Sequence, residues 1–167
     1  MRALLSVANR DGIVDFARGL LDLGVAVYAT DGTRDHLAAS GVDVASVSEL
    51  TAVPPLVGGQ VKTFHPAIYA GILVRRDRPE QLAELAAAGI APIDIVAVNV
   101  TPFAPAIGRQ VRALDEAIEL IDVGGVALLG AAARNPAGVA VAARPAHYPT
   151  IVAEIRQFGA VTAETRA

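Results

Sequence analysis

The residues best suited to do chemistry lie in one short segment, residues 58–66, which reads Gly-Gly-Gln-Val-Lys-Thr-Phe-His-Pro. Lys62 is the single lysine of a chain that carries thirteen arginines. An ammonium is a compact donor that releases its proton readily on burial, whereas a guanidinium stays charged. A lysine retained in this way indicates proton transfer or contact with a developing anion. The alternative is a solvated charge on a loop.

The neighbours of Lys62 add further functional groups. Thr63 offers a hydroxyl and His65 a titratable ring, while the two glycines before the lysine let backbone amides approach a ligand closely. Pro66 suits the first turn of a helix. A histidine in such a place is often a structural hydrogen-bonding group, so both roles stay open for His65.

Other polar residues follow the predicted strands, at turns where a parallel sheet binds ligands. With the lysine segment they form one candidate crevice, whose members are Ser6, Asn9, Arg10, Thr30, Asp31, Gly32, Thr33, Gln60, Lys62, Thr63, His65, Asn99, Thr101, Asp122, Gly124, Gly125, Arg134 and Asn135. Several have a structural alternative. Thr30 or Asp31 can cap the helix that follows. Asp122 can accept from the amides of its own turn, and Arg134 can stabilise a helix C-terminus.

The elements that must position these groups alternate along the chain. Apolar runs predict strands at residues 3–7, 25–29, 42–47, 93–98 and 138–142. Helical spacing predicts helices between and after them, at residues 13–23, 33–41, 66–73, 79–88, 114–121, 126–134 and 145–158. This alternation indicates an α/β fold with a parallel sheet of about five strands. Residues 48–65 are expected to be irregular, and residues 162–167 to be frayed.

Composition narrows the function further. The 167 residues suit one domain, and the absence of cysteine excludes disulfides, thiolate metal sites and a cysteine nucleophile. A net charge of −3 with mixed signs and few aromatic residues argues against a nucleic-acid partner. No apolar run is long enough for a membrane span, and the N-terminus predicts a strand rather than a signal peptide. The absence of cysteine makes a cytoplasmic chain the default expectation. Neither metal-ligand spacing nor a nucleophile elbow is present.

A set of motifs in fixed order is more specific than any single turn. It comprises Ser-Val at 6–7, Gly-Ile-Val-Asp-Phe-Ala at 12–17, Gly-Thr at 32–33, Val-Ser-Glu-Leu-Thr at 47–51, the lysine segment, Ala-Gly-Ile-Leu at 70–73, Asn-Val-Thr-Pro-Phe at 99–103, Ile-Asp-Val-Gly-Gly at 121–125 and Ala-Ala-Ala-Arg-Asn at 131–135. Over residues 3–155 the chain thereby resembles the IMP cyclohydrolase domain of the bifunctional purine-synthesis enzyme.

The resemblance implies a Rossmann-like, methylglyoxal-synthase-like fold and a homodimer. The larger formyl-transferring domain of such enzymes is not found in the sequence, so we expect residues 1–167 to form a single cyclohydrolase-like domain. The implied reaction closes a formamido-imidazole-carboxamide ribonucleotide to IMP with loss of water and without a cofactor.

The family's site residues carry over in part. Lys62, Asn99 and Asp122 match its lysine, asparagine and aspartate, but Thr101 stands in place of its tyrosine and Arg134 in place of its second lysine. These five form the implied catalytic set. The implied substrate-binding set is Ser6, Asn9, Arg10, Thr30, Asp31, Gly32, Thr33, Gln60, Val61, Thr63, His65, Val123, Gly124 and Gly125.

The turns that bind phosphate in the family also depart from its pattern. Asp31 replaces a glycine, Gln60 and Gly130 replace arginines, and Arg10 replaces a lysine. A carboxylate beside a phosphate site opposes anion binding.

We therefore predict ring closure, or its hydrolytic reverse, on a purine-like precursor or related heterocycle, with or without a 5′-phosphate. The alternatives are a sensor that binds a purine intermediate without turnover and, less favoured, phosphate elimination of the methylglyoxal-synthase type.

Overall fold

A five-stranded parallel sheet forms the centre of the computed structural model, which describes residues 1–100 and 114–167. Its strands are β1 (Arg2–Val7), β2 (Ala26–Ala29), β3 (Ala45–Ser46), β4 (Ile95–Asn99) and β5 (Ala140–Ala142), in the order β3-β2-β1-β4-β5. All neighbouring strands run parallel. The structure thus confirms the α/β fold expected from the alternation of apolar runs and helical patterns.

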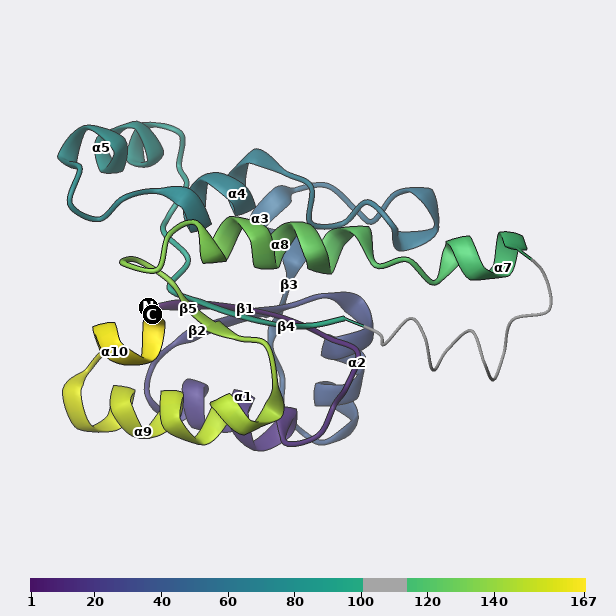
Figure 1. Ribbon diagram of the computed structural model, residues 1–167, viewed down its shortest axis with the longest axis horizontal. Coiled ribbons are helices and arrows are strands. Elements are labelled where there is room, and N and C mark those ends of the chain that lie inside the picture. Colours follow the sequence, from purple (N-terminus) through teal and green to yellow (C-terminus); the bar gives the residue numbers. More distant parts are fainter. Residues whose placement is uncertain (101–113) are drawn as a thin grey trace.

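Helices cover both faces of the sheet (Figure 1). One face carries α1 (Ile13–Asp22), α2 (Asp31–Ala39) and α9 (Tyr148–Phe158). The other carries α3 (Val47–Thr51), α4 (Pro66–Leu73) and α8 (Val123–Ala133). The remaining elements are α5 (Pro79–Ala87), α7 (Leu114–Glu119), α10 (Ala163–Arg166) and the short 3-10 turns η1 (Val57–Gly59) and η2 (Pro145–His147). Figure 1 shows α7 at the margin of the molecule, beyond the N-terminal end of α8.

The period-two geometry of β1 divides the core into two layers. Ala3 and Leu5 face α1 and α9, whereas Leu4 between them faces α4 and α8, and each is at most 1% exposed. Because β1 is buried on both sides, it reads as a continuous apolar run rather than an alternating one.

Parallel pairing brings the ends of β1 and β4 together, since Val7 lies opposite Asn99 in the register. The turns after β1, β2 and β4 therefore lie at one edge of the sheet, as the sequence predicted.

Some predicted boundaries were wrong. Residues 48–65 are not wholly irregular, because Ser46 and Glu49 form a capping box that starts α3 at Val47. The third strand, expected at 42–47, is reduced to two residues. Residues 162–167 are not frayed: Thr162 caps α10, and Glu154 accepts hydrogen bonds from Thr162 and Thr165. Helix α8 starts at Val123 rather than 126, because Asp122 caps it.

Among the described residues, no helix is both long and apolar enough to cross a membrane.

Candidate functional site

A crevice of about 330 Å³ opens at the carboxyl edge of the sheet, between the lysine segment and the N-terminal end of α8. It is lined by Ser6, Gly58, Gly59, Gln60, Lys62, Thr63, Glu119, Leu120, Ile121, Asp122, Val123, Gly124 and Gly125. Eight of these residues belong to the set predicted from the sequence. The crevice is therefore built from three segments that lie far apart in the chain.

The lysine loop is a closed turn whose backbone fixes Lys62. Leu56 and Val61 exchange two backbone hydrogen bonds, of 2.9 and 3.1 Å, that close the loop. Within it, the half-buried Lys62 donates from Nζ to the carbonyl oxygen of Gly59 at 3.0 Å. The ammonium is thus held at the wall of the crevice rather than extended into solvent.

Helix α8 begins at the crevice with a side-chain cap. One carboxylate oxygen of Asp122, Oδ1, accepts from the backbone N–H of Gly125 at 2.7 Å. The amides of Val123 and Gly124 precede the first intrahelical bonds, so by their position they have no partner within the helix. A helix N-terminus favours negative charge. Lys62 and this N-terminus can donate to an anionic or oxyanionic group, while Asp122 and Glu119 add negative charge to the same crevice.

Both glycines of the Asp-Val-Gly-Gly motif are closely packed. A Cβ at Gly125 would lie 2.5 Å from Oδ2 of Asp122 and 3.0 Å from Val100. At Gly124 it would lie 3.2 Å from Oγ1 of the buried Thr63. The double glycine therefore lets the aspartate fold back over the helix and lets the lysine segment approach it.

Hydrogen bonds connect the floor of the crevice to the turn after β2. The Oγ1 hydroxyl of Thr30 lies 3.2 Å from Oγ of Ser6, which lines the crevice. Oγ1 of Thr33 accepts from the backbone N–H of Val7 at 3.1 Å. These bonds hold the N-terminal end of α2 against the end of β1.

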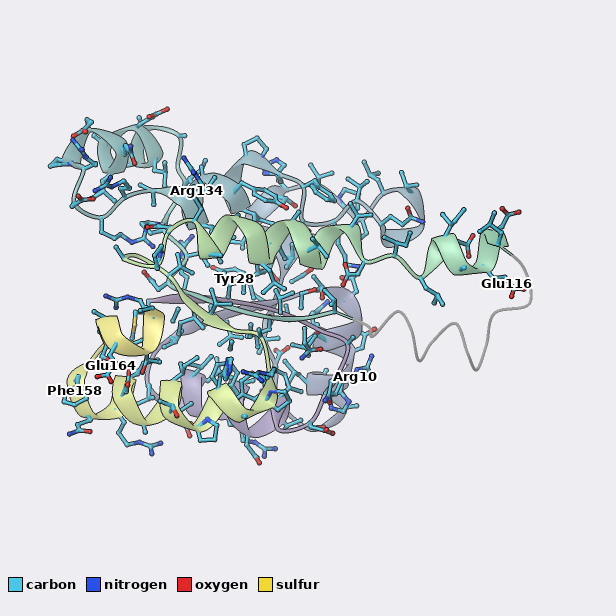
Figure 2. All side chains as sticks on the ribbon, viewed as in Figure 1. Arg10, Tyr28, Glu116, Arg134, Phe158 and Glu164 are labelled. Carbon is cyan, nitrogen blue, oxygen red and sulfur yellow. The ribbon has the colours of Figure 1, made fainter. Side chains whose placement is uncertain are left out.

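Asn99 ties the loop after β1 to the end of β4. Its Oδ1 accepts from the backbone N–H of Asn9 at 2.6 Å, and its Nδ2 donates to the Asn9 carbonyl at 3.1 Å. The exposed Arg10 follows, with its guanidinium Nη2 3.6 Å from where a Cβ of Gly32 would lie. Asp31, the first residue of α2, is exposed beside Gly32. Figure 2 shows the position of Arg10. Asn99 and this loop flank the crevice without lining it.

Three residues of the predicted set lie away from the crevice and its flanking turns, namely His65, Arg134 and Asn135. His65 caps α4, where its Nδ1 accepts from the Ala67 amide at 3.1 Å, and it lines a separate pocket with Arg2 and Glu49. Arg134 is the C-cap of α8, at the opposite end of the helix from Asp122 (Figure 2). A rise of about 1.5 Å per residue separates the two by roughly 18 Å.

The buried Asn135 has a structural role. Its Nδ2 donates to the carbonyls of Ile72 and Val74 at 2.7 and 2.9 Å, which joins the end of α8 to the end of α4. Thr101, the remaining predicted catalytic residue, lies outside the described residues.

The structure adds lining residues that the sequence did not indicate. Glu119 and Leu120 reach the crevice because they precede the Asp122 cap, and no motif marks them. Ile121 opens the Ile-Asp-Val-Gly-Gly motif but was not assigned to the site. In the described part of the chain, no cluster of three His, Asp or Glu side chains is suited to a metal ion.

The chain is similar in sequence to a known domain family and to known proteins. The MGS-like domain family matches residues 12–127. The chain is 46% identical over 165 residues to the "Bifunctional purine biosynthesis protein PurH" of Listeria monocytogenes serotype 4b (strain F2365), and 44% identical over 164 residues to the protein of the same name from Rhodopirellula baltica. These matches cover 99% and 98% of this chain but 32% and 31% of the relatives, so the chain spans about a third of their length.

A solved structure also matches. The crystal structure of ForH superimposes with a TM-score of 0.84 at 37% identity, over 99% of this chain and 86% of that chain. The comparisons confirm the resemblance that the ordered motifs indicated, and they agree with the parallel sheet described above.

Proposed function

The chain belongs to the family of MGS-like domains, and from this premise we propose that it is a cyclohydrolase-type enzyme acting on a formamido-carboxamide purine precursor or a related heterocycle. The reaction is ring closure with loss of water, or its hydrolytic reverse. The observation that carries this proposal is the crevice itself, where Lys62, Asp122 and the first amides of α8 meet. Purine biosynthesis by the matched relatives supports the choice of substrate class.

The ring-closing step needs a proton acceptor and a site for negative charge. The carboxamide nitrogen attacks the formyl carbon, forms the C–N bond and loses a proton, while the formyl oxygen gains negative charge and then a proton. The C–O bond then breaks, and the hydroxyl leaves as water with a proton from a ring nitrogen while a C=N bond forms, which completes the ring. Asp122 is fixed by the Gly125 amide and can orient the carboxamide or accept its proton.

The groups opposite the aspartate suit the developing oxyanion. Lys62 can stabilise the formyl oxygen and then protonate it, with the first amides of α8 as further donors. In the structure its ammonium lies on the Gly59 carbonyl, so the proposed reaction requires it to turn from that oxygen to the substrate. Holding both ends of one substrate in this crevice supplies rate by orientation as well.

We assign the turns after β1 and β2, which lie beside the crevice, to binding the part of the substrate that does not react. Arg10 and the N-terminal end of α2 are the proposed contacts for a phosphate, and Asp31 opposes them by its charge. We propose no cofactor. On the resemblance we also propose a homodimer, and the absence of cysteine supports a cytoplasmic location.

The decisive experiment incubates the protein with formamido-imidazole-carboxamide, as ribonucleotide and as nucleoside, and follows loss of one water by mass spectrometry. Ring closure of either form supports the proposal, and a clear preference for the ribonucleotide would exclude the unphosphorylated substrate. No product from either, or from other imidazole carboxamides, would reject it.

A second candidate function is a sensor that binds the intermediate without turnover. It is favoured by the position of Arg134, which leaves the crevice without a counterpart of the second lysine that the resemblance implies. A rise in melting temperature with the precursor, without any product, would select this function.

A further inference from the structure

Helix α8 is apolar on both of its faces. Its residues, Val123–Ala133, include no polar or charged side chain. The inner face packs in one of the two core layers. The outer face carries Val123, Val126, Gly130 and Ala133, and its two valines are 58% and 59% exposed. A helix that is apolar all round is typical of an element that is buried on every side.

Helix α9 shows how this chain builds a helix that faces water. It is as long as α8 and also covers the sheet, yet the polar side chains of Thr150, Arg156 and Gln157 are exposed on it. On α8 only valine, glycine and alanine take the corresponding exposed places. Exposed apolar side chains also border α8 on the lysine segment and α4, at Val61, Phe64 and Leu73. An exposed apolar surface of this kind marks an interaction site.

The spacing on the outer face of α8 fits a pair of antiparallel helices. Its four residues recur after three, four and three positions, which is the a/d pattern of paired helices. With a twofold axis at the middle of the helix, Val126 lies opposite Gly130 of a second copy, and Val123 lies opposite Ala133. Each valine then meets a residue no larger than alanine, so the two backbones can approach to about 8 Å. The face is therefore complementary to itself.

Charges at the two ends of α8 are complementary in the same register. Asp122 precedes the outer face and Arg134 follows it, so the antiparallel pair brings Arg134 of each copy to the level of Asp122 of the other. The crevice at that end holds the carboxylates of Asp122 and Glu119 beside the single ammonium of Lys62. Arg134 is exposed, and its side chain makes no hydrogen bond or ion pair with the described residues of its own chain. An exposed cation thus meets an excess of negative charge.

The helical period decides on which side of the pair Arg134 lies. At about 100° per residue, Arg134 and Gly124 fall on the same side of the outer face. A twofold axis between antiparallel helices sets equal sides next to each other. Gly124 is packed against Thr63 of the lysine segment. Arg134 of the second copy therefore approaches the crevice from the side of the lysine segment.

Helix α7 extends the same surface. None of its six residues is buried, and Leu114 and Ile118 are exposed. A helix this short needs packing to be stable in water. Because α7 lies beyond the N-terminal end of α8 (Figure 1), an antiparallel pair sets it alongside the second copy. It adds area toward the roughly 800 Å² per partner of a standard interface, which one helix face does not supply alone.

We propose that the outer face of α8 is the interface of a twofold dimer of this chain, in which Arg134 of each copy completes the crevice of the other. This gives the dimer expected from the resemblance a defined face and register. The guanidinium stabilises an anionic part of the substrate and leaves proton transfer to other groups. The role of Arg134 rests on the proposed function, whereas the helix pair does not.

The oligomeric state tests the helix pair independently of any activity. In analytical ultracentrifugation at micromolar concentration, we expect the wild type to have twice the chain mass of 17.1 kDa. Val126→Glu should raise the dissociation constant at least about 100-fold, because the symmetry buries the new charge twice. Phe158→Glu on α9, on the opposite side of the sheet (Figure 2), changes an equally exposed apolar residue and should leave the dimer intact. A monomeric wild type, or a folded Val126→Glu variant that remains a dimer, would overturn the inference.

Disulfide formation tests the register, since the chain has no cysteine of its own. After subunit exchange, a mixture of Val126→Cys and Gly130→Cys should form a covalent dimer on mild oxidation at least about tenfold faster than either variant alone. Faster linkage of either variant to itself would exclude the antiparallel register.

Subunit mixing tests the role of Arg134 if the wild type closes the ring. Lys62→Met and Arg134→Ala should each lower the rate of ring closure about tenfold or more. Each mixed dimer contains one crevice with both Lys62 and Arg134, so an equal mixture should recover about a quarter of the wild-type rate. A mixture without recovery would refute the action of Arg134 across the interface, while sedimentation judges the helix pair separately.

Discussion

The substitution Gly125→Ala tests how the crevice is built at the start of α8. A methyl group at this position would lie 2.5 Å from Oδ2 of Asp122 and 3.0 Å from Val100, well inside normal contact distance. The methyl group must displace the Asp122 carboxylate, whose Oδ1 accepts a hydrogen bond of 2.7 Å from the Gly125 amide. Loss of an N-cap costs about 1 kcal/mol, and overpacking costs about 1–3 kcal/mol.

Alanine also favours a helix over glycine by about 1 kcal/mol, which offsets part of this loss. We therefore expect a net destabilisation of about 2 kcal/mol and a fall in Tm of about 4–8 °C for a domain of this size. Thermal unfolding followed by circular dichroism measures it.

Gly130→Ala is the matched control on the same helix. No atom lies within 4 Å of a Cβ at this exposed position, so alanine should raise Tm by about 2–4 °C through helix propensity alone. If Gly125→Ala stabilised the protein as Gly130→Ala is expected to, the close packing of Asp122 over the helix would be refuted.

Three further predictions concern other residues. Asp122→Asn keeps an equally good N-cap, so Tm should stay within about 2 °C while the rate of ring closure falls at least about 100-fold. Asp122→Ala should lower both Tm and the rate. An active Asp122→Asn variant would exclude a proton-accepting role for Asp122. Asn135→Asp sets a carboxylate against the carbonyls of Ile72 and Val74 and should cost about 3 kcal/mol in urea unfolding, whereas a neutral result would contradict the two hydrogen bonds. Hydrogen bonds from Thr165 and Thr162 lower the pKa of Glu154, so its contribution to docking α10 is present above the ordinary value of about 4.3 and is lost as the pH falls through the lowered pKa. Amide protection of α10 should decrease over that acidic range, and Glu154→Gln should remove the pH dependence; identical profiles would refute this role.

Much of the fold follows from the sequence because periodicity reports burial. The apolar run of β4, for example, is buried on both faces, and helical spacing identified α1 and α9. The errors arise where a local side-chain bond overrides the pattern. The Ser46–Glu49 capping box starts a helix inside a segment that prolines and glycines made look irregular.

The candidate site was predictable to the extent that motifs report it. Lys62, Thr63, Asp122 and the double glycine come together as expected. The order of the motifs could not show where Arg134 lies relative to Asp122. The two residues are twelve positions apart and cap opposite ends of the continuous helix α8, so they lie far from each other.

The most direct test of the account is the rate of ring closure of the formamido-carboxamide precursor by the wild type, Lys62→Arg and Lys62→Met. We predict measurable closure by the wild type and a loss of about 100-fold or more in both variants, since arginine keeps the charge but is a poor proton donor, with Tm little changed. Wild-type activity that survived in either variant would contradict the central role of the Lys62 ammonium in this crevice.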